Sequence, residues 1–330
     1  MKEEISGIHH VTAIATDPQL NVNFYAGVLG LRLVKKTVNF DDPGTYHFYY
    51  GDEHGTPGTI LTFFPWRGIR RGRQGTGQAT VTSFSIPEAS LGCWIERLTK
   101  HGIEYDKPLR RFDEQVLAFR DGDGLMLELV AHAGEQRDGW EQGSVPAEHA
   151  IRGFHTITLC VDGFEKTAKL LTETMGFRQT GEEGNVYRYA VKDGGAGRQV
   201  DIRCAPGFWQ GVVAGGTVHH VAWRTPSDET QLAWRARIAA LGLNVTPVMD
   251  REYFHSIYFR EPGGILFEIA TDPPGFTVDE PLETLGTSLK LPPWLEESRA
   301  ELERTLTPVH VPEAFTGSNA NSEITQKKFL

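Results

Sequence analysis

The sequence repeats one structural pattern four times, and this repetition constrains the fold more than any other feature. Each copy opens with a short apolar strand, continues into an amphipathic helix that ends at a glycine, and closes with further strands. The copies cover residues 8–65, about 80–132, from 153 onward, and 217–272. This order predicts an α+β fold of four βαβββ modules, in which helices cover one face of curved sheets.

The first copy shows the pattern most clearly. We predict a strand over 8–15 and a helix that enters at Asp17-Pro18 and ends at Gly30, with Leu20, Phe24, Val28 and Leu29 on one face. The other predicted helices cover 91–101, 164–175 and 227–241. The other predicted strands cover 34–40, 46–50, 59–64, 83–86, 125–129, 153–159, 200–202, 217–222 and 259–270.

The repeats predict two tandem domains of the same kind. We expect an N-terminal domain over 5–133, a polar linker over 134–150 and a C-terminal domain over 151–272. A C-terminal extension over 273–330 contains one predicted helix, at 295–306. Its last part, 317–330, is polar and expected to be mobile.

Charge and composition narrow the class of protein. The formal net charge is −10 and there is no long basic run, which argues against a nucleic-acid partner. The first residues lack the apolar centre of a signal peptide, and no apolar run approaches the roughly 20 residues that span a membrane. Three widely spaced cysteines without a CxxC motif are typical of a reduced compartment, so we expect a cytoplasmic protein.

Two adjacent histidine pairs, His9-His10 and His219-His220, lie on the opening strands of the first and fourth copies. Twelve histidines in 330 residues give only about 0.4 such pairs by chance. Because side chains alternate along a strand, only one imidazole of each pair faces a given side. His10 and His220 hold corresponding positions, and neutral imidazole is the commonest metal ligand in proteins.

Glu268 lies in the middle of the closing strand of the fourth copy, between Phe267 and Ile269. A carboxylate there is costly unless it is paired or binds a metal. The alternative is a solvent-facing glutamate on a half-exposed strand. Two imidazoles and one carboxylate leave open positions and suit non-haem Fe(II) that binds substrate and O₂ together. We therefore predict Fe(II), with Mn(II) as a substitute, at His10, His220 and Glu268.

Comparison of the four copies predicts which residues replace the metal ligands at the corresponding positions. Alignment of 57–63 with 262–268 places Phe63 where the fourth copy has Glu268, so we expect this ring to contact the substrate. In the two middle copies Glu128 takes the Glu268 position. Thr156 and either Ser83 or a near neighbour take the histidine positions, so we expect no tight metal site there. His155 is expected to be a hydrogen-bonded core histidine.

The segment 250–258 supplies candidates for substrate contact. Arg251 could hold a substrate oxyanion, and Tyr258 could donate to an oxygen bound at iron. His255 is a further candidate. The alternatives are a surface cation for Arg251 and an ordinary strand aromatic for Tyr258.

These motifs resemble the vicinal-oxygen-chelate superfamily, which includes glyoxalase I, bleomycin-resistance proteins and extradiol dioxygenases. The resemblance covers 5–272 and is carried by Ile8-His9-His10-Val11-Thr12, by His219-His220 and by the ending from Tyr258 to Glu268. The sequence is most similar to dioxygenases that cleave para-hydroquinones, such as the methylhydroquinone and chlorohydroquinone dioxygenases.

The resemblance implies Fe(II) at the three predicted ligands, in a site shared by the first and fourth copies. It implies supporting or acid–base roles for His9, Thr12 and His219, and substrate contacts from Arg251 and Tyr258. We also expect Thr12 to contact the substrate. Common catechol 2,3-dioxygenases take their first ligand from the third copy. Thr156 departs from that pattern and favours the hydroquinone branch.

We therefore predict an Fe(II)-dependent, extradiol-type ring-cleaving dioxygenase that inserts O₂ into a hydroquinone- or catechol-type aromatic, with His219, His9 or Tyr258 moving protons. The expected partners are a small aromatic substrate, O₂ and further copies of the chain. One alternative is a glyoxalase-like isomerase or thiol transferase, which would need a fourth ligand where Phe63 is placed. The other is a metal-free aromatic- or drug-binding protein, which would not need paired histidines.

Overall fold

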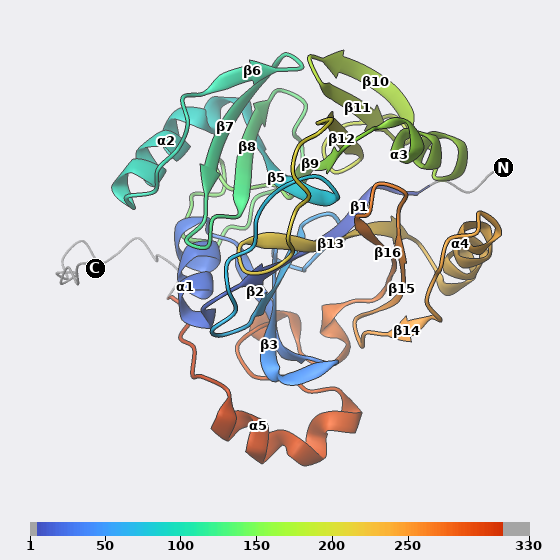
Figure 1. The fold of residues 1–330 in the computed structure, drawn as a ribbon. Coiled ribbons are helices and arrows are strands. Elements are labelled where there is room, and N and C mark those ends of the chain that lie inside the picture. Colours follow the sequence, from blue (N-terminus) through green and yellow to red (C-terminus); the bar gives the residue numbers. More distant parts are fainter. Residues whose placement is uncertain (1–4, 313–330) are drawn as a thin grey trace.

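The strands of this protein assemble into two curled sheets, each built from one unit of either half of the chain (Figure 1). The structure is a computed structural model that describes residues 5–312. In that range each sheet has eight strands. The first sheet has the order β14-β15-β16-β13-β1-β4-β3-β2, which joins the first and fourth units. The second has the order β10-β11-β12-β9-β5-β8-β7-β6, which joins the second and third. The predicted α+β arrangement of βαβββ modules is confirmed.

Each sheet is joined at its centre by two opening strands. In the first sheet β1 pairs with β13 antiparallel, with Val11 opposite Val221. In the second sheet β5 pairs with β9 antiparallel. The strands of the first sheet are β1 Ile8–Ala15, β2 Arg32–Asn39, β3 Asp42–Gly51, β4 Ile60–Pro65, β13 Thr217–Thr225, β14 Met249–Asp250, β15 Phe254–Arg260 and β16 Leu266–Pro274. Those of the second are β5 Gln78–Pro87, β6 Leu109–Arg111, β7 Glu114–Arg120, β8 Met126–His132, β9 Phe154–Val161, β10 Arg178–Glu183, β11 Val186–Ala190 and β12 Gln199–Cys204.

The central strands are buried on both faces. Every residue of β1 and of β9 is buried, because one side of each strand faces the inside of the curled sheet and the other faces the main apolar core. The predicted single strand over 259–270 is wrong. It divides into the end of β15, a turn at 261–265 and the start of β16, because Gly264 adopts φ +99° in that turn.

The helices lie outside the sheets (Figure 1). The α-helices are α1 Pro18–Val22, α2 Leu91–Lys100, α3 Glu165–Lys169, α4 Asp228–Ala240 and α5 Arg299–Thr305. The helices of the first and third units change to π-helix, as η1 Asn23–Val28 and η3 Leu170–Thr174. This wider turn rotates the helix face, so Phe24 and Leu29 are buried whereas Leu20, predicted on the same face, is 53% exposed.

The C-terminal extension packs on the outer edge of the first sheet, where α5 lies near β3 (Figure 1). The predicted helix over 295–306 is shorter than expected. A 3₁₀ segment, η6 Pro293–Ser298, precedes α5, because two prolines at 292 and 293 open it. Further 3₁₀ turns are η2 Glu88–Ser90, η4 Phe276–Val278 and η5 Leu282–Thr284. The predicted mobile tail at 317–330 lies outside the described residues.

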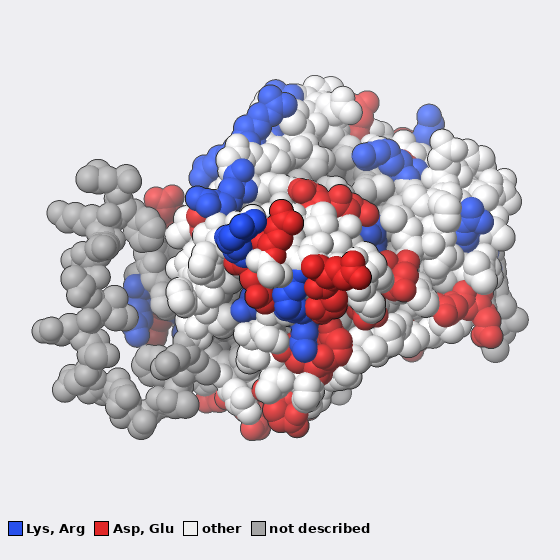
Figure 2. All heavy atoms as spheres, turned by 90° about the horizontal axis from the view of Figure 1, so that it is seen from below, with Lys and Arg blue, Asp and Glu red and all other residues white. Residues whose placement is uncertain are grey.

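The predicted boundaries at 133 and 151 stay a prediction. The segment between β8 and β9 forms turns and bends. In residues 5–312 no helix is long and apolar enough to cross a membrane. Figure 2 shows a mixed surface on the face seen from below, with acidic side chains gathered at its centre and basic ones along one edge.

Candidate metal centre

Three side chains from three strands of the first sheet meet at one point. His10 lies on β1, His220 on β13 and Glu268 on β16, and each is at most 5% exposed. The sheet register brings them together, because His10 lies opposite Ala222 and Ala222 lies beside Glu268. His10 Nε2 is 3.3 Å from His220 Nε2 and 3.3 Å from Glu268 Oε2. His220 Nε2 is 2.9 Å from Glu268 Oε2.

These separations fit three ligands of one metal ion. Metal–nitrogen and metal–oxygen bonds of about 2.0–2.2 Å hold neighbouring ligand atoms roughly 3.0–3.5 Å apart. The buried Glu268 Oε2 accepts no well-formed hydrogen bond, whereas Oε1 accepts one from Ser256 Oγ at 2.5 Å. A buried carboxylate oxygen without a donor is costly, and a cation at this point would satisfy it. Among the described residues this is the single group with metal-binding geometry.

A backbone carbonyl sets the tautomer of His10. His9 Nε2 lies 3.1 Å from the carbonyl oxygen of Thr271, which can only accept, so this nitrogen must carry a proton. Neutral His9 then accepts at Nδ1, where His10 Nδ1 lies 2.9 Å away and must donate. The lone pair of His10 is therefore on Nε2, which faces Glu268.

The second histidine pair has the same geometry. His219 Nδ1 and His220 Nδ1 are 2.8 Å apart, so donation from His220 leaves the His220 lone pair on Nε2. Burial lowers the pKa of His220. Burial and then His220 lower the pKa of His219 to about 3. Both rings are thus neutral near pH 7, which is the state a metal ligand and its supporting partner require.

A cavity of about 380 Å³ opens beside the three ligand atoms. Five predicted site residues line it: His10, His219, His220, Arg251 and Tyr258. It is also lined by acidic, aromatic and apolar side chains that the sequence did not single out, including Asp41, His47, Tyr49, Phe64, Trp66, Phe254 and Leu266. A small aromatic molecule in this cavity would lie next to the candidate metal position.

Arg251 and Tyr258 both line the cavity and are hydrogen-bonded to each other. Arg251 Nε donates to Tyr258 Oη at 3.2 Å, and Nη2 contacts Asp41 Oδ2 at 3.0 Å. Burial and then the Glu268 carboxylate raise the pKa of Tyr258, so its hydroxyl keeps its proton at pH 7. Because the phenol oxygen already accepts from Arg251, its proton is free to be donated elsewhere.

Three predicted substrate contacts are wrong. His255 points away from the cavity, where its Nδ1 lies 2.6 Å from Asp228. Thr12 is fully buried behind the cavity wall, and its hydroxyl lies 2.8 Å from that of Thr62. Phe63 is fully buried in the core, with its ring 4.4 Å from that of Tyr25.

Phe63 was misplaced because the alignment was one residue out of register. Thr12 pairs with Thr62, as Ala222 pairs with Glu268, so Thr62 holds the position that corresponds to Glu268. From the proline to this position the fourth unit has one residue more, because Glu268 follows Pro262 by six residues whereas Thr62 follows Pro57 by five. The glycines with matching backbone are Gly58 at φ +98° and Gly264 at φ +99°. The first unit still offers no second carboxylate.

His9 does not fit the predicted role in moving protons of the substrate. Both of its ring nitrogens are engaged, and its ring does not line the cavity. Its contacts instead fix the tautomer and the orientation of His10.

The structure adds a hydrogen-bonded chain that sequence reasoning missed. Tyr49 Oη lies 2.8 Å from His47 Nδ1, and His47 Nε2 lies 2.9 Å from Thr62 Oγ1. Burial lowers the pKa of His47 well below its usual value. Tyr49 pairs with Thr62 as Tyr258 pairs with Glu268, so a correct alignment of the two units would have identified the two tyrosines as equivalents.

The corresponding place in the second sheet is filled by arginines. Arg111 contacts both oxygens of Glu128 at 2.9 and 2.6 Å, and Arg188 contacts both oxygens of Asp201 at 2.8 and 3.0 Å. These guanidinium groups neutralise the carboxylates. The register places Val81, a near neighbour of Ser83, at the histidine position. His155 is fully buried, with Nε2 2.7 Å from Glu114, as expected of a core histidine.

Comparisons with known proteins place the chain in a family. The model of the Glyoxalase/Bleomycin resistance protein/Dioxygenase superfamily matches residues 7–129 and 153–269. The chain is 50% identical to the Bacillus subtilis protein named "Putative ring-cleaving dioxygenase MhqO", over 95% of this chain and 99% of that protein. It is 36% identical to the Sphingobium indicum chlorohydroquinone/hydroquinone 1,2-dioxygenase, over 93% of this chain and 97% of that protein.

A solved structure supports the same assignment. The crystal structure of a Bacillus subtilis protein described as a "putative dioxygenase" superposes with a TM-score of 0.91 at 50% identity. The match covers 94% of this chain and 99% of that chain. The family match spans most of both repeated halves, and two relatives share at least 36% identity over nearly their whole length. The chain therefore belongs to the Glyoxalase/Bleomycin resistance protein/Dioxygenase superfamily.

Proposed function

We propose that this protein is an Fe(II)-dependent, extradiol-type dioxygenase that cleaves a hydroquinone- or catechol-type aromatic ring. The observation that carries the proposal is the meeting of His10, His220 and Glu268 beside a cavity of about 380 Å³, which His10 and His220 line. Two imidazoles and one carboxylate are the ligand set of many non-haem Fe(II) oxygenases, and Mn(II) suits the same ligands. The full-length relatives named as ring-cleaving dioxygenases support this reading.

The alternatives fit the site less well. A glyoxalase-like isomerase would be favoured by a fourth protein ligand, but the corresponding residue is Thr62, whose hydroxyl contacts Thr12 and His47. In a metal-free binding protein, two imidazole lone pairs and a carboxylate oxygen would have no reason to converge at one buried point, because they repel one another there.

Bound at the three ligands, Fe(II) would offer open positions to a substrate oxygen and to O₂ and would pass electron density from the aromatic ring to O₂. The chain supplies the surroundings. Phe64, Trp66 and Phe254 provide apolar walls that contact a ring and exclude water. Arg251, held between Asp41 and Tyr258, presents positive charge to a phenolate or carboxylate oxygen.

Tyr258 is the proposed proton donor. Its oxygen accepts from Arg251, so its own proton can be donated to an oxygen of the substrate. His219 lines the same cavity and carries its proton on Nε2, which makes it a second donor. Tyr49 can donate a hydrogen bond to the substrate or accept one from it. His47 allows both, because its Nδ1 can donate to Tyr49 or accept from it while its Nε2 takes the opposite role toward Thr62.

Oxygen consumption tests the proposed activity. Protein loaded with Fe(II) under anaerobic conditions is expected to consume O₂ when mixed with methylhydroquinone, hydroquinone or catechol, with the hydroquinones faster. The measurement is an oxygen-electrode assay with product spectra, and the Zn(II)-loaded protein is the control. If the iron-loaded protein consumes no O₂ with any of these phenols, the proposal is wrong.

The Tyr258→Phe variant is expected to lower kcat about a hundredfold, the size typical of a lost general acid. Its iron content is expected to stay unchanged, because Tyr258 is not among the proposed ligands. The matched control is Tyr46→Phe. Tyr46 is also a buried strand tyrosine, but its ring stacks on Phe48 and does not line the cavity. Equal rates for the two variants would exclude Tyr258 as the donor.

We also propose that the chain forms a homo-oligomer. The observation behind it is the set of apolar side chains exposed on 208–213, where Trp209 is 55% and Val213 is 46% exposed. A monomer mass by light scattering would rule it out.

A further inference from the structure

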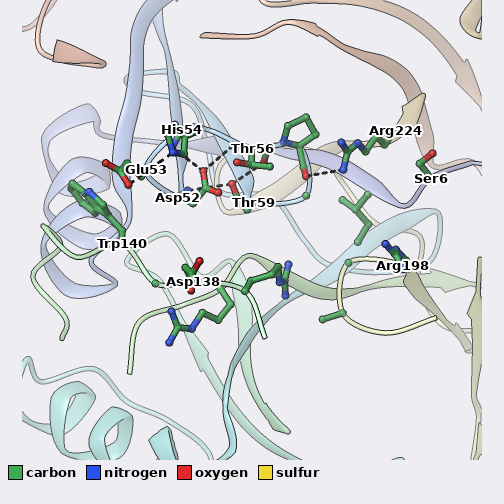
Figure 3. Close-up of a pocket in the computed structure, with 18 residues that line it drawn as sticks. Ser6, Asp52, Glu53, His54, Thr56, Thr59, Asp138, Trp140, Arg198 and Arg224 are labelled. Atoms are coloured by element: carbon green, nitrogen blue, oxygen red, sulfur yellow. Dashed lines mark hydrogen bonds and ion pairs between the residues drawn. The ribbon is translucent and has the colours of Figure 1, made fainter. Parts of the chain in front are cut away.

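A second cavity, of about 500 Å³, lies where the two sheets face each other, and it shares no lining residue with the metal cavity. The turn 52–59 of the first sheet forms one wall. The segments 137–140 and 196–198, next to the second sheet, form the other. Figure 3 shows Trp140 at one end and Arg198 toward the other, with His54 and Asp52 facing Asp138 across the space.

Four arginines line this cavity, and two of them are neutralised by carboxylates. Arg137 Nε donates to Glu135 at 2.9 Å and its Nη2 donates to the same carboxylate at 2.5 Å. Arg224 Nε donates to Asp272 at 2.6 Å. These two side chains are structural, because each forms a close ion pair with an acid that does not line the cavity.

The other two arginines, Arg152 and Arg198, have no ion pair or side-chain hydrogen bond within residues 5–312. Arg152 is the more telling, because its Nε is buried and lacks an acceptor. A buried donor without an acceptor is unfavourable. Burial also lowers the pKa of the Arg152 guanidinium.

The backbone leaves room for the Arg152 guanidinium by means of a glycine. A Cβ added at Gly139 would lie 2.3 Å from Arg152 Nη1, so a larger residue there would displace the charged group. The Arg152 guanidinium therefore packs closely against the Gly139 backbone, and within residues 5–312 no carboxylate forms an ion pair with it.

Within residues 5–312, the acids that line the cavity form no ion pair with these two arginines. Asp52 Oδ1 accepts from the backbone N–H groups of His54 and Thr56, at 3.1 and 2.8 Å. Glu53 lies near His54, 4.0 Å from its Nε2, and Asp138 is exposed. Because these carboxylates accept hydrogen bonds, they favour a ligand that carries hydroxyl groups as well as an anionic group.

We propose that this cavity binds a small organic anion whose carboxylate or phosphate contacts Arg152 and Arg198. Guanidinium groups suit such oxyanions, because their N–H donors match two oxygens at once. The volume exceeds that of a bare ion, and Trp140 and Ile8 provide apolar surface for the rest of the molecule. The site is independent of the proposed dioxygenase activity.

Calorimetric titration of the full-length, iron-loaded protein under anaerobic conditions tests the proposal. The probes are benzoate for a carboxylate, phenyl phosphate for a phosphate, and benzamide as a neutral match for benzoate. We expect saturable binding of one molecule per chain for at least one anion and none for benzamide. Whichever anion binds more tightly identifies the preferred group.

The Arg198→Gln variant is expected to weaken anion binding at least about tenfold, as for loss of one charge-assisted hydrogen bond. Arg198 is exposed, so this variant should fold normally. Arg152→Gln should have a similar or larger effect. The matched control is Arg251→Gln in the metal cavity, which should leave anion binding unchanged.

Three results would overturn the proposal. They are no saturable binding of either anion, equal binding by wild type and Arg198→Gln, and loss of binding in Arg251→Gln with retention in Arg198→Gln. Oxygen consumption by Arg198→Gln should equal that of the wild type. The proposed anion site and the proposed dioxygenase activity can therefore fail separately.

Discussion

The Glu268→Gln variant is expected to bind iron at least about a thousandfold more weakly and to lose ring cleavage in proportion. Glu268 is the single carboxylate among the three candidate ligands and is fully buried. A carboxylate binds a divalent ion as an anion, and glutamine removes that negative charge without changing the shape of the side chain.

The size of the effect follows from electrostatics. Attraction between a divalent ion and a carboxylate in a dry site is worth several kcal/mol, and about 4 kcal/mol corresponds to a thousandfold change. The measurements are iron per chain after dialysis and the rate of O₂ consumption. Thermal unfolding of the metal-free variant should stay close to that of the metal-free wild type, which separates lost metal from lost fold.

Glu128→Gln is the matched control for this variant. Glu128 holds the corresponding place in the second sheet, where it pairs with Arg111 and Ser83. Its replacement should lower stability but leave the iron content unchanged. Equal iron content in Glu268→Gln and wild type would remove Glu268 from the ligand set.

The Lys35→Met variant is expected to lower the free energy of unfolding by about 3–5 kcal/mol, as for a broken buried ion pair. Lys35 Nζ is fully buried and lies 2.6 Å from Asp279 Oδ1 and 2.9 Å from Glu280 Oε2. Glu280 is also buried, so without the ammonium group its charge has no partner ion. Methionine keeps the length of the side chain, which isolates the charge from the packing.

This ion pair joins the C-terminal extension to strand β2, so its loss should also release the extension. The measurements are urea unfolding and proteolysis of the segment after 275. Lys36→Met is the matched control, because Lys36 is only half-buried and its Nζ makes one long contact, 3.3 Å, with the Thr287 carbonyl. We expect a change within about 0.5 kcal/mol there. A cost below about 1 kcal/mol for Lys35→Met would contradict the proposed role.

The same contact predicts a loss of stability in acid. Burial acts to raise the pKa of Glu280, but the hydrogen bonds from Lys35 and from the Gly286 N–H outweigh it and lower the pKa. A carboxyl with a lowered pKa contributes stability above its unfolded pKa, near 4.3, and loses that contribution as the pH falls through the folded value. The difference in stability between wild type and Lys35→Met should therefore shrink below about pH 4.

Much of the fold and the core of the candidate site could be predicted because the relevant signals are local. Strand alternation selects His10 from His9 and His220 from His219 within a few residues, and glycines mark the helix ends. Glu268 stands out because a carboxylate in the middle of an apolar strand needs a partner. None of these inferences requires knowledge of which strands are neighbours.

The supporting residues could not be predicted, because their roles depend on contacts between distant parts of the chain. The carbonyl that sets the tautomer of His9 belongs to Thr271, 262 residues away in sequence. Phe63 was aligned with Glu268 in place of Thr62 because the fourth unit has one extra residue between its proline and this position. A shift of one residue moves a side chain to the opposite face of the sheet.

The sequence by itself determined four repeated modules and three candidate ligands, because periodicity and residue chemistry are properties of short segments. Only the tertiary structure decided that β1 pairs with β13, that Tyr49 and His47 face the same cavity as Tyr258, and that arginines fill the equivalent place in the second sheet. The physical reason is that pairing and register are set by burial and hydrogen bonding over the whole chain. No single segment contains that information.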